Sequence, residues 1–365
     1  MRKELGMFCA LIALCVIIGI SNHDFLSHAN LTNTSRQIAM LGIFAIGVSF
    51  VIITGGIDLS IGSVIGLTGV IIAKISAPVA EGMSSGAGYP IGVGIAVAMA
   101  VALLIGLAQG LLITRLNLQP FIVTLGGMLL VRGVSQVFTD GGNISFGNHA
   151  FRDLSDQGLY LGSLDLPWIG KILFEVPWPV VMFIGVALVA TYVLHFSVFG
   201  RHLFAIGGNR DAALYSGVPV KRIECSTYVI SAGLAGVAGI GYAAYIGQMS
   251  HSVGEGYELY AITAAVIGGC SLRGGEGTIL GVMIGTAVIR VLDNGINMFK
   301  IPITNAAGQH VSWSLSDNWR NVIIGAVILA AVILDQMSHV LKNRKRTATA
   351  QVKPVTLAIP PPPAH

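Results

Sequence analysis

The sequence predicts an all-α fold: a polytopic helical membrane protein with about ten transmembrane helices. Of its 365 residues, 54% are hydrophobic and only 10% are charged, whereas a soluble domain carries about 25% charged residues. The alternating ten-residue strands of a membrane β-barrel are absent, so a helical bundle is favoured. The 47 glycines suit close helix packing and broken helices.

Ten apolar windows give the expected spans, at about 5–20, 39–55, 59–77, 90–114, 118–138, 178–197, 225–248, 257–270, 277–298 and 320–340. Several are shorter than the roughly 20 residues that a spanning helix needs. Short or broken helices are therefore expected, and the number of spans could change by one or two. The first window lacks a small-residue cleavage site near its end, so we interpret it as a retained helix, not a signal peptide.

The basic residues predict which side of the membrane each connection faces. If both termini are cytoplasmic, twelve Lys and Arg residues lie on inner segments and five on outer ones, which agrees with the positive-inside rule. Residues 1–345 are expected to form one transmembrane domain. Residues 346–365, which end in IPPPPAH, are expected to be a disordered cytoplasmic tail, because four consecutive prolines cannot form a helix.

The stretch FVIITGGIDLSIGSVIGLTG at 50–69 is the most unusual part of the apolar region. A carboxylate at membrane depth, here Asp58, is costly, and backbone groups freed near Gly55 and Gly56 must find partners inside the protein. Such a glycine-interrupted pair of short apolar segments indicates the working region of a transporter. The alternative is a tight cytoplasmic turn in which Asp58 is the N-cap of the second helix, and the two interpretations are compatible.

A second stretch echoes the first one. GGCSLRGGEGTILG at 268–281 resembles GGIDLSIGSVIG at 55–66 and also follows a short apolar segment. Transporter halves are often built from such duplications. Chance similarity between two glycine-rich segments is the alternative.

The longest inner loop, 198–224, has the pattern of a short helix. The turn Gly207-Gly208-Asn209 precedes a run with Asp211 in its first turn, which favours a helix N-terminus. Gly217 and then Pro219 end the run. A preformed helix at the cytoplasmic face could transmit a conformational change from a soluble partner to the membrane helices. The alternative is an ordinary loop that its basic residues hold near the lipid.

Other ionisable residues are few. Arg290 and Asp293 lie three apart in window 277–298 and share a helix face, so a structural ion pair is favoured over a pathway-lining one. Arg132 and Asp335 are interpreted as lone charges, and Arg132 is expected to snorkel or to meet a neighbouring helix. The four cysteines are interpreted as buried small hydrophobes.

No chemistry-bearing motif is present. The histidines have no metal spacing, and HExxH, GxSxG and Walker A sequences are absent. The sequence therefore predicts no metal, no cofactor, no nucleic-acid partner, no catalytic residue and no enzymatic activity of its own.

Three motifs together carry a resemblance. ITGGIDLSIGS (53–63), IGGNRDAALYSGV (206–218) and VIGGCSLRGGEGTILGVMIG (266–285) followed by VLDNGINM (291–298) resemble the membrane permeases of bacterial ATP-binding-cassette sugar importers. These permeases are of the ribose, xylose, arabinose and galactose type and are related to branched-chain amino-acid permeases. The similarity covers roughly Arg36 to Asp335, with the motifs in the same order and spacing.

The resemblance implies a complex in the bacterial cytoplasmic (inner) membrane. Two permease subunits, usually identical, would rest on ABC ATPase subunits, and an extracytoplasmic sugar-binding protein would deliver the substrate. The loop expected to dock on the ATPase is matched by Gly207, Gly208, Asn209, Arg210, Asp211, Ala212, Ala213, Ser216 and Gly217. Asp211 stands where Glu is usual in the family and Tyr215 where Arg is common, which leaves the match to a particular ATPase open.

Further site residues follow from the same resemblance and from the charge pattern. The expected translocation pathway or gate comprises Gly55, Gly56, Asp58, Leu59, Ser60, Arg290, Asp293, Asn294 and Asn297. Docking of the binding protein is expected at the outer basic residues Arg36, Arg152, Lys171 and Arg320. The predicted function is import of a monosaccharide by a permease that another chain drives with ATP; the alternatives are an ion-coupled secondary carrier and a permease for a non-sugar solute such as a branched-chain amino acid.

Overall fold

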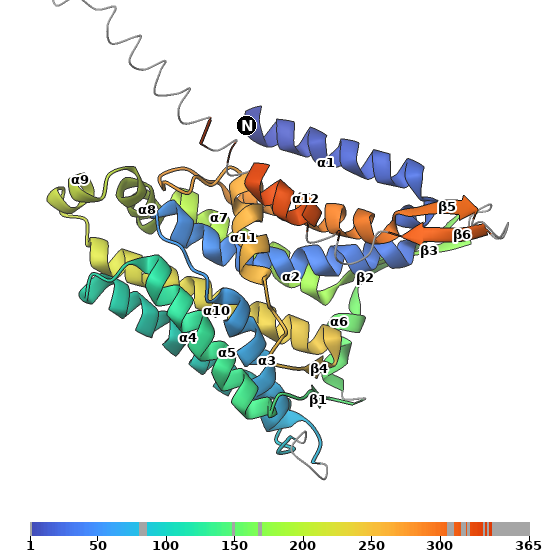
Figure 1. Cartoon of the computed structure of the whole chain (residues 1–365), viewed down its shortest axis with the longest axis horizontal. Coiled ribbons are helices and arrows are strands. Elements are labelled where there is room, and N and C mark those ends of the chain that lie inside the picture. The colour runs from blue at the N-terminus through green and yellow to red at the C-terminus, as the bar shows by residue number, and fades with distance from the viewer. Residues whose placement is uncertain are drawn as a thin grey trace, which may run out of the picture.

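A computed structural model of the chain describes residues 2–79, 86–147, 150–166, 170–304, 310–314, 319, 322–330, 333, 336 and 337. Within these residues the fold is a bundle of helices with small two-stranded sheets at one end (Figure 1). The expected all-α polytopic fold is confirmed. The tail 346–365 and Asp335 lie outside the described residues.

Seven of the described helices are long and apolar enough to cross a membrane. They are α1 (Arg2–Ser21), α2 (His28–Ile53), α4 (Ile91–Arg115), α5 (Pro120–Thr139), α7 (Trp178–Phe196), α10 (Val220–Ile246) and α12 (Ile279–Met298). Two shorter apolar helices, α3 (Ile61–Ser76) and α11 (Tyr257–Ile267), occupy two further expected windows. The last window, 320–340, is described only in part and is helical at 322–330. The number of spans therefore remains a prediction.

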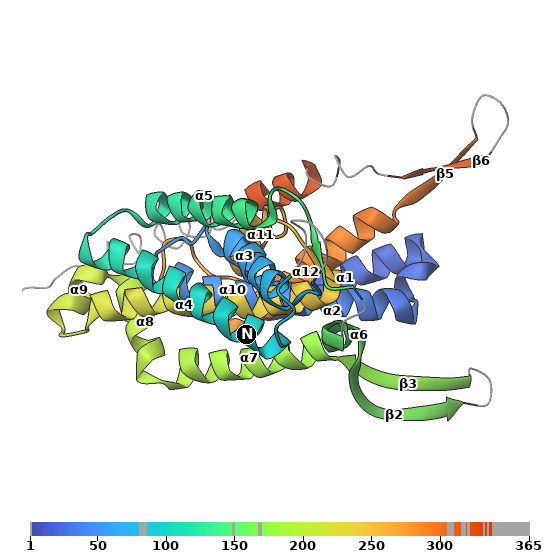
Figure 2. The same ribbon diagram turned by 90° about the horizontal axis from the view of Figure 1, so that it is seen from below.

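The two ends of the bundle differ (Figures 1 and 2). The α9 end carries the small helices α8 (Val198–Gly208) and α9 (Arg210–Tyr215), and the N-terminal end of α1 points the same way. The opposite end, which we call the hairpin end, carries the remaining short elements. They are η1 (His23–Leu26), β1 (Ile144–Ser145), η2 (Ala150–Arg152), α6 (Asp153–Asp156), β2 (Gly158–Leu166), β3 (Gly170–Pro177), β4 (Gln248–Met249), β5 (Lys300–Thr304) and β6 (His310–Ser314).

The sequence did not anticipate the hairpins, which follow the expected membrane windows 118–138 and 277–298. β2 pairs antiparallel with β3, so that Leu159 faces Val176 and Leu164 faces Ile172. β5 pairs in the same way with β6. The alternating apolar residues of GLYLGSLDL and GKILFEVP suit such a ladder, but a short hairpin is a weak signal beside the membrane spans.

The core of the bundle is formed by α2 and α10. Every residue of α2 from Ala39 to Ile53 is buried, and α10 packs against α2, α3 and α4. Close approach is needed along α10, since a Cβ at Gly110 of α4 would lie 2.9 Å from the carbonyl oxygen of Cys225. The peripheral helix α1 exposes apolar side chains, as a lipid-facing helix does. Of the four cysteines expected to be buried, Cys270 is buried, Cys15 and Cys225 are half-buried, and Cys9 on α1 is exposed, so the expectation is wrong at Cys9 and holds only in part at Cys15 and Cys225.

Candidate functional site

The three glycine-rich motifs come together near the α9 end of the bundle. The carbonyl oxygen of Ile53, at the end of α2, accepts a hydrogen bond of 2.9 Å from the backbone N–H of Gly275. A Cβ at Gly274 would lie 2.9 Å from both Gly207 Cα and Gly55 N. A Cβ at Gly207 would overlap Ile53 O and Gly275 N. We call these five residues the glycine junction, where backbones from three distant segments touch with no side chain between them.

Left-handed backbone conformation explains part of this glycine content. Gly55, Gly274 and Gly275 have φ values of +83°, +84° and +76°, a region that costs other residues energy. Gly207 is different, since close approach and not φ excludes a side chain there. Local backbone geometry and packing therefore both require glycine at the junction.

The α8–α9 segment extends from the junction to the surface. Asn209 ends α8 and is the N-cap of α9, where its side-chain oxygen accepts a bond of 2.9 Å from Ala212 N. Asp211 lies in the first turn of α9, and Gly217 follows the helix with φ +82°. The short helix expected after residue 209 is thus confirmed, but the expected turn at Gly207-Gly208-Asn209 is wrong in part, because Gly207 and Gly208 are the last residues of α8.

Most of α9 is exposed. Ala213 is buried, whereas Leu214 and Tyr215 are 50% and 88% exposed. Arg210 binds both carboxylate oxygens of Glu224 on α10, at 2.7 and 3.0 Å. This bidentate pair raises the pKa of the Arg210 guanidinium above its ordinary value. The pair fixes α9 to the start of α10 and leaves Leu214 and Tyr215 exposed.

The interruption between α2 and α3 is tied to neighbouring helices through Asp58. Asp58 Oδ1 accepts bonds from Ser60 N at 3.0 Å and Ser60 Oγ at 2.7 Å, and Oδ2 accepts one of 2.7 Å from Ser231 Oγ on α10. Ser60 Oγ also lies 3.0 Å from Gln109 Oε1 on α4. All four side chains are buried. The N-cap residue of α3 is Ser60, so the interpretation of Asp58 as the cap is wrong. The oxygens of Asp58 instead connect the break before α3 to α10 through Ser231 and, by way of Ser60, to Gln109 of α4. We call these four bonded residues the Asp58 tie.

The echo between 55–66 and 268–281 corresponds to two similar breaks. The first separates α2 from α3 and the second separates α11 from α12. They are not identical, because α12 is capped by the Thr278 side chain, which accepts from Gly281 N at 3.0 Å, whereas Ser60 makes no side-chain cap. The two breaks touch at the glycine junction. A duplication remains a prediction.

Arg290 and Asp293 form an enclosed cluster. Arg290 Nη1 donates to Asp293 Oδ2 at 3.3 Å, and Nη2 donates to the hydroxyl of Tyr242 at 3.1 Å. The guanidinium carbon lies 5.7 and 5.6 Å from the ring centroids of Tyr257 and Tyr260. Arg290 and Asp293 are 5% and 3% exposed. The expected pair is confirmed, and its enclosure favours the structural interpretation over a pathway.

The remaining expected site residues are scattered. Asn294 exchanges two amide hydrogen bonds with Asn30 of α2, and Asn297 is exposed near the hairpin end. Arg36 and Arg152 are half-buried. Arg320 and the side chain of Lys171 lie outside the described parts, so binding-protein docking stays a prediction.

Sequence reasoning missed a second polar cluster, which includes Arg132. Arg132 Nη1 lies 3.7 Å from a carboxylate oxygen of Glu255 and donates to His251 O at 3.4 Å. Arg132 is therefore not a lone charge. The polar run SHSVGEGYE at 250–258, between two apolar windows, was the available signal.

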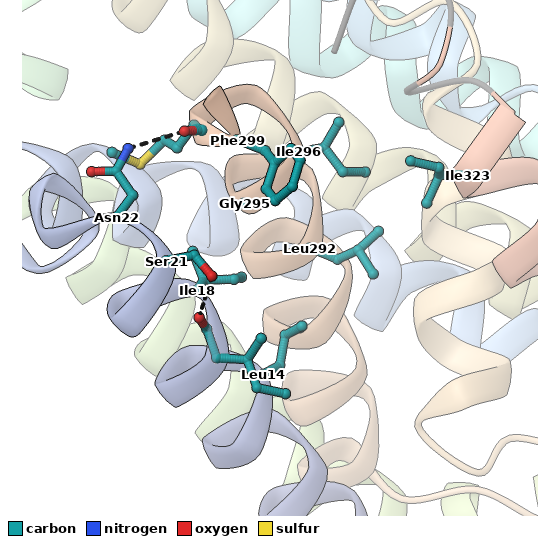
Figure 3. Close-up of a pocket in the computed structure, with 11 residues that line it drawn as sticks. Leu14, Ile18, Ser21, Asn22, Leu292, Gly295, Ile296, Phe299 and Ile323 are labelled. Atoms are coloured by element: carbon teal, nitrogen blue, oxygen red, sulfur yellow. Dashed lines mark hydrogen bonds between the residues drawn. The ribbon is translucent and has the colours of Figure 1, made fainter. Parts of the chain in front are cut away.

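The cavities described do not suit a polar ligand. One of about 260 Å³ lies between α1 and α12, and its lining is mainly Leu and Ile, with Asn22 and Ser21 at its edge bonded to backbone oxygens (Figure 3). Two others, of about 630 and 790 Å³, are also lined mainly by apolar side chains. Among the described residues, no group of His, Cys, Asp and Glu could hold a metal ion.

Comparisons with known proteins identify relatives over most of the chain. Residues 30–332 match the model of a family described as "Branched-chain amino acid transport system / permease component". The chain is 36% identical over 335 residues to the ribose import permease protein RbsC of Bacillus subtilis, covering 92% of this chain and 93% of the relative. It is 31% identical to the D-allose transport system permease protein AlsC of Escherichia coli, covering 91% of each chain. It is also 31% identical to the xylose transport system permease protein XylH of Haemophilus influenzae, covering 91% and 96% of the two chains. No solved structure matches significantly.

Proposed function

The chain belongs to the branched-chain amino acid transport system / permease component family, and on that premise we propose that it is the permease subunit of an ATP-driven monosaccharide importer. It is a multi-pass protein of the bacterial inner membrane. The relatives named for ribose, allose and xylose import favour a monosaccharide over a branched-chain amino acid or an ion-coupled carrier.

The glycine junction is the observation that carries the proposed mechanism. α8 ends at Gly208, and its Gly207 abuts the end of α2 and the loop that precedes α12. A displacement of α9 would therefore press directly on backbone, with no flexible side chain to absorb it. Packed elements of this kind switch between discrete arrangements and do not deform smoothly.

The complex follows from this arrangement. In our proposal the α9 end is cytoplasmic, and the exposed Leu214 and Tyr215 enter a groove on a separate ATPase subunit. The hairpin end then faces the extracytoplasmic binding protein, and a second copy of the chain completes the translocating unit. ATP binding drives transport because the ATPase subunits bind one conformation of the permease better than the other.

The Asp58 tie is assigned to the gate and not to a sugar-binding site. Both of its carboxylate oxygens accept bonds from protein donors, and Asp58 is only 1% exposed, so a solute does not reach this carboxylate in the conformation described. Because the tie spans α10 and the break before α3, it holds the middle of the bundle closed until the junction moves.

The first test is energetic coupling. We expect vesicles that contain the permease, its ATPase subunit and its binding protein to accumulate ribose only with ATP, and vesicles with the permease alone to accumulate none. Uphill uptake by the permease alone, abolished by an uncoupler, would instead support the ion-coupled carrier.

The second test is a glycine pair in the complete importer. Gly207→Ala places a methyl group against Ile53 O and Gly275 N, and should abolish uptake while the ATPase still co-purifies. Gly92→Ala on α4 is the matched control, because a Cβ there meets nothing within 4 Å. Normal uptake by Gly207→Ala would remove the junction from the mechanism.

A further inference from the structure

The Arg132 cluster comprises Arg132 of α5, His251 and Glu255 of the segment that precedes α11, and Glu258 in the first turn of α11. The guanidinium contacts a carboxylate oxygen of Glu255 and the backbone carbonyl oxygen of His251. α5 and the segment 251–258 thus bring four ionisable residues into one region of a chain with only 10% charged residues.

The depth of the cluster follows from helix geometry. α10 has 27 residues and is about 40 Å long at 1.5 Å per residue. Ser231, which binds Asp58, lies about 16 Å along it, and Gly239, which abuts Ile65 O of α3, lies about 28 Å along it. The start of α3 is therefore near the middle of the membrane.

Glu258 is at this same level. A Cβ at Gly62, the second residue of α3, would overlap Glu258 Oε2 and the carbonyl oxygen of Gly254. Arg132 agrees, because it lies about 18 Å along a helix α5 that is about 30 Å long. The cluster is thus at mid-membrane depth, next to the Asp58 tie.

The cluster also opens to the outside of the single chain. The side chain of Glu255 is 72% exposed and that of Arg132 is 17% exposed, and Ser252 is exposed beside them. Charged groups at this depth face a water-filled cavity or a protein partner and not lipid, because lipid exposure is costly.

Two polar atoms in the cluster point to a missing partner. Glu258 Oε2 and His251 Nδ1 are buried and have no hydrogen-bond partner among the described residues, and Glu258 is 8% exposed overall. Buried polar atoms are almost always bonded to protein or to water. Their exposed neighbours make water or a solute the available partner.

We infer that the Arg132 cluster is a wall of the aqueous path, where its side chains exchange hydrogen bonds with a passing neutral polyhydroxyl solute. Sugar hydroxyls both donate and accept, and the cluster offers a guanidinium donor beside carboxylate acceptors. The contacts are few and partly exposed, which suits a solute that must leave as readily as it enters. This inference rests on the proposed function for the identity of the solute, but not for the presence of water.

The presence of water is tested by cysteine accessibility in nanodiscs that hold the permease with its ATPase. Glu255→Cys should react with a charged methanethiosulfonate reagent in the ATP-free or the nucleotide-trapped state. Leu130→Cys should not react, since Leu130 is at nearly the same depth but is 67% exposed on another side of α5. The unsubstituted chain gives the background from the four native cysteines. An unreactive Glu255→Cys in both states would mean a dry interface or lipid and would overturn the inference.

The solute contact is tested by transport in vesicles of the complete importer. Arg132→Gln and Glu258→Gln should each lower ribose uptake about tenfold, the effect of one lost hydrogen bond to a charged group, while ATP hydrolysis stays near that of the unsubstituted importer. Arg132→Lys should restore part of the uptake. Gln136→Ala, one turn further along α5, should leave both rates unchanged.

The outcomes separate the two proposals. Normal ribose uptake by Arg132→Gln and Glu258→Gln would overturn the proposed contact between the cluster and the solute, even if Glu255→Cys reacts with the charged reagent. If a variant loses both rates because it does not assemble, an unreactive Glu255→Cys overturns the inference and a reactive one supports it. Failure of the unsubstituted importer to accumulate ribose, D-allose or D-xylose contradicts the proposed monosaccharide and leaves the accessibility result valid.

Discussion

Arg132 and Arg290 lie on two different membrane helices and have opposite surroundings. Arg290 is enclosed: Asp293 and Tyr242 bind its terminal nitrogens and two tyrosine rings cover its faces. Arg132 reaches an exposed carboxylate through a contact of 3.7 Å. The sequence places the Arg290 pair among the expected pathway residues while favouring a structural ion pair, and it indicates a lone charge at Arg132. The enclosure of Arg290 supports the structural ion pair and directs attention to Arg132, because a solute can reach only an arginine that is open to water.

The largest expected effect is on stability, at the enclosed arginine. Arg290→Gln removes the buried ion pair with Asp293 and should lower the free energy of unfolding by about 3 kcal/mol. Thermal unfolding in detergent measures this loss. Replacing both residues, as Arg290→Met with Asp293→Leu, should recover much of it, and a double variant no better than the single one would contradict the enclosed-pair interpretation.

A smaller effect on stability is expected at Arg132. Arg132→Gln should lower the free energy of unfolding by about 1 kcal/mol or less, because its partner Glu255 stays solvated. Thermal unfolding in detergent again provides the measurement. The tenfold loss of ribose uptake expected for this variant should therefore occur in a protein that is nearly as stable as the unsubstituted chain. A loss as large as that of Arg290→Gln would erase the distinction between the two clusters.

The smallest effect is expected at an ion pair outside the membrane. Arg210→Gln should change the free energy of unfolding by less than about 1 kcal/mol, since its side chain is 47% exposed. Its consequence should be functional, because α9 loses its attachment to α10 through Glu224. Continued ATP hydrolysis with reduced sugar uptake would show that the Arg210–Glu224 pair couples the ATPase to the bundle, unlike the Arg290–Asp293 pair, which stabilises the fold. Normal sugar uptake would contradict a coupling role for the Arg210–Glu224 pair.

Much of the site could be predicted because its signals are local. Asn209, Asp211 and Gly217 define both ends of α9 by capping chemistry that depends on a few consecutive residues. Gly55 and Gly56 marked the break after α2 for the same reason. The partners of Asp58 could not be predicted, since Ser231 lies 173 positions away along the chain.

The sequence by itself determined the membrane bundle, most of its helices and the motifs that identify its family, because hydrophobicity and glycine content act over short stretches. Only the tertiary structure decided that Gly207, Gly275 and Ile53 touch, and that Arg290 is enclosed while Arg132 is open. These facts depend on which helices pack together, and packing joins residues whose separation along the chain carries no local signal.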